Sequence, residues 1–349
     1  MLDILRQFWF PAVFTFLSMI FACLLAVKFF PKLGLMDRPH RYGLSRAPIP
    51  YYGGILIYTV FLILTLCFVE IDRSVIALIA GATLIFVVGF LDDLYNLSPI
   101  IRLAVQFVAG VVLVIGGVGI LSINLPLVGT LVLSEPVIGG VMILSALFTI
   151  FWVMALLNTM NFVDGIGGLS SGVTFVAGLT IFALSIHPGI HENPESQIGV
   201  ATIALIIAMI SFAFLLFDFP KPKILMGDSG STLLGFLIAA LAIFSGGKVA
   251  TAFLVLGIPI LDMIWVVVRR TLKGKKFWQG DLLHLHHRLL GINLSERVVV
   301  LIYLFVTALF GIFAVTFVTT EQKLFILAAL VILMLLLATA LVLLPRKKQ

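Results

Sequence analysis

Long apolar runs separated by short polar segments fill almost the whole chain. Many of these runs approach the roughly 20 apolar residues that a helix needs to cross a bilayer. None alternates strongly between apolar and polar positions, as the strands of a membrane barrel do. The pattern therefore predicts an all-α polytopic membrane protein with about 11 transmembrane helices. The predicted spans are residues 8–30, 53–69, 75–91, 103–120, 137–157, 168–186, 198–217, 231–245, 250–268, 298–318 and 324–344.

Composition excludes a water-soluble globule, because 62% of the 349 residues are hydrophobic and only 11% are charged. The formal net charge of +6 is explained by basic loops beside a membrane, so no nucleic acid is expected as a partner. Cys23 and Cys67 lie inside apolar runs, and we expect from them neither a disulfide nor a metal site.

Lysine and arginine are unequally distributed over the two sides of the predicted bundle. Of the 22 basic residues, only Arg6, Arg73, Lys248 and Lys323 fall on one side, which leaves 18 on the other. Basic loops stay in the cytoplasm. The N-terminus is therefore predicted outside and the C-terminus inside, in the inner (cytoplasmic) membrane. On the outer side, residues 121–134 are predicted to form a small β-hairpin.

The acidic residues with candidate chemistry fall on the basic, inner side. Asp92 and Asp93 are adjacent at the junction of two apolar runs. A hydrated turn is the alternative interpretation, but it needs neither two acids nor Asn96 one helical turn later. Because carboxylates in hydrocarbon cost several kcal/mol, we interpret the pair as a binding or catalytic element.

Two further inner segments combine acids with amides or glycines. Asn158, Asn161 and Asp164 share a helix face until Gly165, and their oxygens suit a hard cation or a polar headgroup. Hydrogen bonding between helices is the alternative. Asp228 begins another apolar run, as an N-cap would. The same helix start could also offer backbone N–H groups to a phosphate, with the carboxylate beside them for Mg²⁺.

Basic side chains complete the candidate site. Arg38 and Arg41 suit a phosphate, although they could equally rest on anionic lipid headgroups. A second group lies in the longest basic loop and consists of His284, His286, His287 and Arg288. Zinc is not expected, because its ligands usually come from separated segments and no cysteine or distant histidine completes a shell. We interpret the group as donors for a diphosphate, with a hydrated basic loop as the alternative.

One domain, 1–349, is predicted, and its inner loops 31–52, 92–102, 158–168, 218–230 and 269–297 are predicted to form the active site. Carboxylates for Mg²⁺ and proton transfer, next to cations for phosphates, indicate an enzyme that joins a cytosolic phosphate compound to a membrane lipid. A secondary transporter is the main alternative, and Asp262 inside a predicted span fits it better. Transporters, however, usually show paired halves, and this chain has no internal repeat.

The same loops carry a family resemblance. In order, Gly89-Phe-Leu-Asp-Asp93, Asn158-x-x-Asn-Phe-x-Asp-Gly165, Met226-Gly-Asp-Ser-Gly-Ser231 and His284-x-His-His287 resemble the polyprenyl-phosphate N-acetylhexosamine-1-phosphate transferase superfamily. The histidine motif is more similar to the branch that uses UDP-N-acetylglucosamine than to the branch that loads N-acetylmuramoyl-pentapeptide. The resemblance implies Mg²⁺-dependent (or Mn²⁺-dependent) transfer of a sugar-1-phosphate from a UDP-sugar to undecaprenyl phosphate, which releases UMP and initiates a cell-envelope glycan. A homodimer is left open.

Residue roles follow from the resemblance together with the loops described above. The expected catalytic residues are Asp92, Asp93 and Asp164; the expected metal ligands are Asp228 and Asn161; and the expected substrate-binding residues are Asn158, Arg102, His284, His286, His287, Arg288, Arg38 and Arg41. Two positions depart from the family pattern. Arg102 stands where the family usually has Lys, which keeps the charge but changes its geometry. Gly167 stands where it usually has Asp, which puts the nucleobase contact expected there in doubt: uridine is either held differently, or the nucleotide preference is relaxed.

Overall fold

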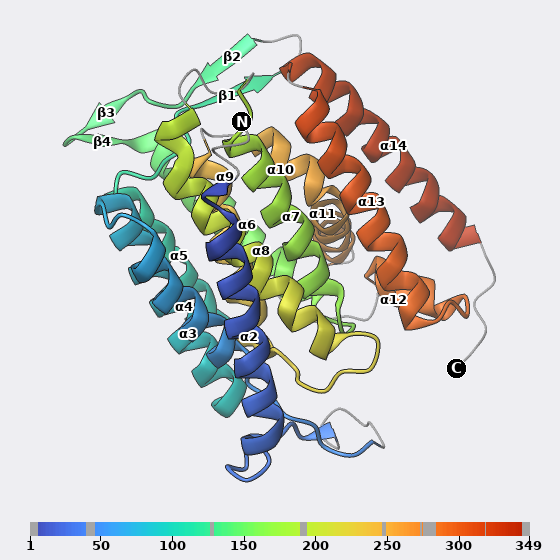
Figure 1. Cartoon of the computed structure of the whole chain (residues 1–349). Coiled ribbons are helices and arrows are strands. Elements are labelled where there is room, and N and C mark those ends of the chain that lie inside the picture. The colour runs from blue at the N-terminus through green and yellow to red at the C-terminus, as the bar shows by residue number, and fades with distance from the viewer. Residues whose placement is uncertain are drawn as a thin grey trace.

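The computed structural model describes residues 6–39, 46–125, 129–188, 194–245, 249–272, 274, 284–317 and 319–343. Helices dominate these residues (Figure 1). They are α2 (Trp9–Phe29), α3 (Gly54–Phe68), α4 (Arg73–Tyr95), α5 (Pro99–Ile115), α6 (Ile143–Val163), α7 (Leu169–Ser185), α8 (Ile198–Asp218), α9 (Gly227–Phe244), α10 (Val249–Val255), α11 (Gly257–Leu272), α12 (Leu285–Gly291), α13 (Glu296–Thr316) and α14 (Thr320–Leu343), with a short 3-10 helix η2 (Pro194–Gln197).

Apolar length agrees with the predicted class. In the described part of the chain, six helices are long and apolar enough to cross a membrane, namely α2, α4, α6, α8, α9 and α13. Shorter apolar helices are α3, α5, α7 and the Gln322–Leu336 portion of α14. The coarse prediction of a helical, multi-pass membrane protein is confirmed, whereas the count of about 11 spans and their orientation stay predictions.

Side-chain caps explain where several helices begin. Asp72 precedes α4 and accepts a hydrogen bond from the Val75 N–H at 2.7 Å. Ser98 precedes α5 and accepts from the Ile101 N–H at 3.4 Å, with a proline in the first turn. Such caps satisfy N–H groups that have no partner within the helix. The short polar segments of the sequence therefore end one helix and start the next.

The predicted span 250–268 is not one helix. α10 ends at Val255 and α11 begins at Gly257. Pro259 falls in the first turn of α11, where its missing N–H is tolerated; in a continuous helix it would remove a hydrogen bond and clash with the preceding turn. The prediction of a continuous helix was therefore wrong. The second half, α11, contacts α6 and α14.

Two small hairpins precede α6. β1 (Ser122–Leu125) pairs antiparallel with β2 (Gly129–Val132), which confirms the hairpin predicted within 121–134. A second hairpin, β3 (Val137–Ile138) with β4 (Val141–Met142), was not predicted. Its residues were assigned to the span 137–157, because a short apolar run does not distinguish a strand from the start of a helix.

Helix α9 is the centre of the bundle. It contacts α3, α4, α6, α7, α8 and α10. Every residue from Leu233 to Ile243 is buried, as expected for a helix that is apolar on all faces. Because α9 is enclosed by its neighbours, its first turn is held close to the end of α4 and the end of α6.

The two ends of the bundle differ. The hairpins and the N-terminal end of the described chain lie at one end, whereas the segment before α3, the α8–α9 connection and α12 lie at the other (Figure 1). The segments that were predicted to lie on the inner side of the membrane are therefore grouped at one end of the molecule.

Candidate active site

Two cavities meet at one carboxylate. The apolar cavity, of about 420 Å³, lies among α4, α5, α6, α9 and α11. The polar cavity, of about 250 Å³, lies between the segment before α3, the end of α6 and the α8–α9 connection. Asp228 lines both. A ligand in either cavity can therefore reach this side chain.

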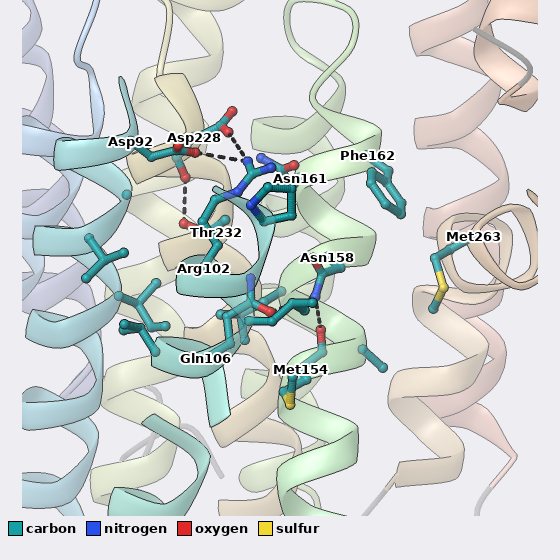
Figure 2. A pocket seen from close by; sticks show the side chains of 18 of the residues that line it. Asp92, Arg102, Gln106, Met154, Asn158, Asn161, Phe162, Asp228, Thr232 and Met263 are labelled. Carbon is teal, nitrogen blue, oxygen red and sulfur yellow. Dashed lines mark hydrogen bonds and ion pairs between the residues drawn. The ribbon is translucent and has the colours of Figure 1, made fainter. Parts of the chain in front are cut away.

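The apolar cavity has its charged groups at one end. Figure 2 shows Asp92, Arg102, Asn161 and Asp228 close together, with Met154 further along the bundle. The remaining lining is mostly aliphatic or aromatic and includes residues from Met263 to Val268 of α11. Such a cavity suits a molecule with an anionic head and a long apolar chain.

Arg102 joins two carboxylates. Its Nη1 lies 2.9 Å from Asp92 Oδ2 and 3.2 Å from Asp228 Oδ2 (Figure 2). Asp92 is buried, and its other oxygen accepts the Leu97 N–H at 2.7 Å. The guanidinium thus offsets one of the two negative charges of an acidic pair that comes from two helices far apart in the sequence. Both oxygens of Asp92 are engaged.

Asp93 caps the start of α9. Its Oδ1 accepts from the Asp228 N–H at 2.8 Å and from the Tyr51 hydroxyl at 3.0 Å. Its Oδ2 accepts from the Ser229 N–H at 3.2 Å and hydroxyl at 2.6 Å. Gly227 permits this approach, because its φ is +75° and an added Cβ would lie 2.6 Å from Oδ2. Two of the first N–H groups of α9, which were expected to be available to a phosphate, are therefore bound to Asp93.

The polar cavity concentrates negative charge. Asp93, Asp164, Asp218 and Asp228 all line it. Burial, and then the charges of the other three aspartates, raise the pKa of Asp164 well above its ordinary value. Carboxylates confined in this way favour a divalent cation, since it removes their mutual repulsion.

Basic residues lie at the rim of the same cavity. Arg38 and Arg46 line it, and Arg46 pairs with Asp37 at 2.6 Å. Arg38 is exposed, so it is available to an anionic ligand. Arg41, which was predicted to act with it, lies outside the described residues.

The polar stripe of α6 is divided between the two cavities. Asn158 and Asn161 line the apolar cavity, whereas Asp164, just after the helix, lines the polar one. The Asn158 amide donates to Gln106 Oε1 at 2.8 Å and to the Met154 carbonyl at 2.7 Å. For Asn158, this is hydrogen bonding between helices, which was the alternative to ligand binding considered from the sequence. Asn161 instead faces α9 and donates to Ser231 Oγ at 3.2 Å.

Gly167 has a structural reason to lack a side chain. An added Cβ would lie 2.6 Å from both the Asp218 carbonyl oxygen and Pro222 Cγ. Asp218, the last residue of α8, is buried beside it, and its Oδ2 accepts from the Gly168 N–H at 2.8 Å and the Ser171 hydroxyl at 3.1 Å. Oδ1 receives no hydrogen bond from the described residues. The carboxylate expected at position 167 is absent, but Asp218 brings one to the same part of the cavity.

The histidine loop lies beside these segments. His284 and His286 are buried, and the two rings are stacked with centroids 5.8 Å apart. A Cβ added to Gly165 would lie 2.5 Å from His286 Nε2, so this ring abuts the lining of the polar cavity. Burial, and then His287 and His284, lower the pKa of His286 to about 3. A neutral His286 ring can contribute to ligand binding through hydrogen bonds but not through charge.

His287 and Arg288 have different surroundings. The centroid of the His287 ring lies 4.2 Å from the centroid of the His286 ring. Arg288 lines a third cavity of about 160 Å³ between α11, α12 and α14, together with Asp262 and Leu285. It is not among the described residues that line the two cavities at Asp228. Its expected contact with a diphosphate stays a prediction.

The oxygen donors fit a hard cation. In the described ranges, no three His, Cys, Asp or Glu side chains are close enough to form a ready-made coordination shell. Mg²⁺ does not require one, because it binds through one or two carboxylates, waters and substrate phosphates. Asp228 supplies such a carboxylate, and Asn161 lies beside it (Figure 2). The excess of carboxylates in the polar cavity supports the same assignment.

Several contributors were missed by sequence reasoning. Tyr51, Gln106 and Asp218 act through contacts between segments far apart in the chain. Asp262, noted from the sequence only as fitting a transporter, does the same. Asp218 and Asp262 did carry a signal, since an acid within or at the end of an apolar run is costly without a partner. Gln106 carried a weaker signal of the same kind. Tyr51 carried none.

Comparison with known proteins adds a family match. The protein-family model described as "Glycosyl transferase family 4" matches residues 75–246 of this chain. This range contains Asp92, Asp93, Arg102, Asn161, Asp164 and Asp228.

Curated relatives cover most of the chain. The "Decaprenyl-phosphate N-acetylglucosaminephosphotransferase" of Mycobacterium tuberculosis is 33% identical over 308 residues, which are 79% of this chain and 74% of the relative. The protein of the same name from Mycolicibacterium smegmatis is 31% identical over 328 residues, 84% and 77% of the two chains. The "Undecaprenyl-phosphate alpha-N-acetylglucosaminyl 1-phosphate transferase" of Escherichia coli is 28% identical over 310 residues, again 84% and 77%.

Proposed function

Since the chain belongs to the polyprenyl-phosphate N-acetylhexosamine-1-phosphate transferase superfamily, in its N-acetylglucosamine branch, we propose the following reaction. The protein transfers GlcNAc-1-phosphate from UDP-GlcNAc to undecaprenyl phosphate, and UMP is released. One observation carries the proposal: an apolar and a polar cavity meet at Asp228. A transferase that joins a lipid to a nucleotide sugar needs such a meeting point.

The acceptor lipid is assigned to the apolar cavity. Its aliphatic walls along α5, α6 and α11 suit a polyprenyl chain, and Arg102 at the charged end suits the phosphate. A dianionic phosphate would add charge beside Asp92 and Asp228, so the guanidinium at 2.9 Å and 3.2 Å from them is the group that makes its approach tolerable.

The donor is assigned to the polar cavity. Arg38 at its rim and His286 beside Gly165 can donate to a diphosphate. His286 Nε2 is buried and has no hydrogen-bond partner in the described ranges, which is costly unless a ligand provides one. In the transfer, a lipid phosphate oxygen forms a bond to the donor's β-phosphorus. The bond from that phosphorus to the bridging oxygen breaks, and UMP leaves with the electron pair.

Mg²⁺, replaceable by Mn²⁺, is the proposed cofactor, held by Asp228 and the Asn161 amide oxygen. When bound, it neutralises phosphate charge that develops during the transfer. Asp93 keeps Asp228 in place through the first turn of α9, and Arg102 orients the acceptor. Asp164, whose pKa is raised, is the candidate to hold a proton near the leaving phosphate.

A panel of nucleotide sugars tests the proposed reaction. Purified protein with undecaprenyl phosphate and Mg²⁺ should release UMP with UDP-GlcNAc and show much less release with UDP-N-acetylmuramoyl-pentapeptide. A secondary transporter would release no UMP with any sugar. Release only with the muramoyl-pentapeptide donor would place the chain in the other branch.

Asp218 is expected to contribute to donor binding. Its free Oδ1 can accept from an N–H or O–H group of the nucleoside, whereas Oδ2 is used by Gly168 and Ser171. Asp218→Asn should raise the KM for UDP-GlcNAc by about 10-fold, because a hydrogen bond to a charged group contributes about 1.5–3 kcal/mol. Ser171→Ala removes one bond to Oδ2 only and should change KM less. Equal effects of the two variants would show that Asp218 is purely structural.

Orientation is the remaining part of the proposal: the site faces the cytoplasm, with the N-terminus outside. Single cysteines at Ser134 and Ser196 should react with an impermeant thiol reagent on intact cells, in a background without Cys23 and Cys67. A cysteine at Gly274 should react only after permeabilisation, because the basic loops stay inside. Labelling of Gly274 from outside would reverse the assignment.

A further inference from the structure

Asp262 is a buried acid within an apolar helix that the proposed reaction leaves unexplained. It lies in α11, and only 9% of its side chain is exposed. A carboxylate at such a position is costly without partners. From the sequence, it was the residue that best fitted an ion site of a transporter.

Its two oxygens bind the histidine loop. Oδ2 lies 3.0 Å from His284 Nδ1, and Oδ1 accepts the Leu285 N–H at 2.8 Å. His284 is the residue before α12, and its side chain is 6% exposed. Because an ionised carboxylate can only accept, His284 must carry its proton on Nδ1. Its Nε2 is then left to face a ligand.

The surroundings connect this pair to both cavities. The His284 ring lies 5.1 Å from that of Phe162, which lines the apolar cavity beside Asn161. The adjacent residues Met263 and Ile264 line the same cavity. On its other side, His284 stacks with His286, which abuts Gly165 of the polar cavity. Asp262 therefore connects α11, which lines the apolar cavity assigned to the acceptor, with the histidine loop assigned to the donor.

We propose that Asp262 is a positioning residue for the transfer: it fixes His284 in the Nδ1–H tautomer and holds α12 against α11. This rests on the proposed role of the histidine loop in donor binding. For metal-bound histidines, replacing the carboxylate that orients the ring typically costs about 10–100-fold in affinity or activity, and we expect an effect of the same order here. A plain helix cap would need only the Leu285 contact.

The decisive test is a double-mutant cycle. Asp262→Asn keeps an acceptor for the Leu285 N–H, but its amide can donate to His284 Nδ1 and favours the wrong tautomer. It should lower kcat/KM by about 10–100-fold. In the His284→Ala background the same change should have almost no further effect, because groups that act through one another are not additive. Asp262→Glu, which keeps the charge, should retain more activity than Asp262→Asn.

The outcomes separate this proposal from the proposed function. If His284→Ala leaves UMP release unchanged, the role of the histidine loop fails, and the positioning role fails with it. If His284→Ala is impaired but the two changes are fully additive, only the positioning role is overturned. Nitrogen-15 NMR of histidine-labelled wild-type protein gives an independent readout that needs no variant. A resonance assigned to His284 with Nδ1–H supports the proposal, and Nε2–H with a bare Nδ1 overturns it.

Discussion

Asp228→Asn is expected to lower kcat/KM by at least about 100-fold, equivalent to about 2.7 kcal/mol of transition-state stabilisation. Among the described residues, Asp228 is the one that lines both the apolar and the polar cavity, so in the proposed reaction its charge would face donor, acceptor and metal together. Asparagine keeps the size and leaves the bundle intact. Because the proposed role of Asp228 is to hold the metal, raising Mg²⁺ should restore part of the activity.

The measurement is a Mg²⁺ titration of UMP release. Asp92→Asn is the matched control, because Asp92 also pairs with Arg102 but, of the two cavities as the described residues line them, it lines the apolar one alone. Both variants should lose activity, yet only Asp228→Asn should shift the Mg²⁺ midpoint upward. An unchanged midpoint in Asp228→Asn would show that this residue serves as a helix-start acid and not as a metal ligand.

The second expected result is that enzyme mixed with UDP-GlcNAc alone releases no stoichiometric burst of UMP. A covalent route would need Asp92 or Asp93 to attack the donor. Asp93 accepts four hydrogen bonds, and Asp92 accepts one from Leu97 and pairs with Arg102. Carboxylates held in this way are poor nucleophiles. A lipid phosphate, with a second pKa of about 6, is already largely dianionic and needs alignment more than activation.

Rapid-quench kinetics checks this result. UMP should appear only after undecaprenyl phosphate is added. Asp93→Asn should lose activity together with thermal stability, because its amide cannot accept from all the donors at the start of α9. UMP equal to the enzyme concentration without lipid, with labelled sugar-phosphate retained on the protein and lost in Asp93→Asn, would establish the covalent route instead.

Apolar runs predicted the helices well, because a chain in lipid must satisfy its backbone hydrogen bonds internally. The grouping of Asp93, Asp164 and Asp228 also followed from sequence, since residues at helix ends on one side of a membrane are brought together by the fold. The break between α10 and α11 did not follow. An apolar run reports that a segment is buried, and Pro259 alone does not distinguish a kink from a new helix start.

The hydrogen-bond partners of the site residues were the part of the structure that the sequence predicted least well. Asp93 was expected to be available for chemistry, but it caps α9, which depends on how closely Gly227 lets two helices approach. Asn158 was expected to bind substrate, which stays a prediction, and its amide N–H bond to Gln106 of α5 was not foreseen. Such pairings depend on helix rotation, which hydrophobicity leaves almost undetermined when a helix is apolar on every face.

In the protein without ligand, the positive charge of Arg102 occupies the place beside Asp92 and Asp228 that a bound cation would otherwise take. While the guanidinium sits between Asp92 and Asp228, any cation must compete with it for Asp228. An anion that draws Arg102 toward itself leaves Asp228 without a neutralising partner and so raises that carboxylate's affinity for a cation. By thermodynamic linkage the reverse holds to the same extent. The proposed lipid phosphate and the proposed metal are therefore expected to favour each other's binding, so that each binds more weakly alone than together.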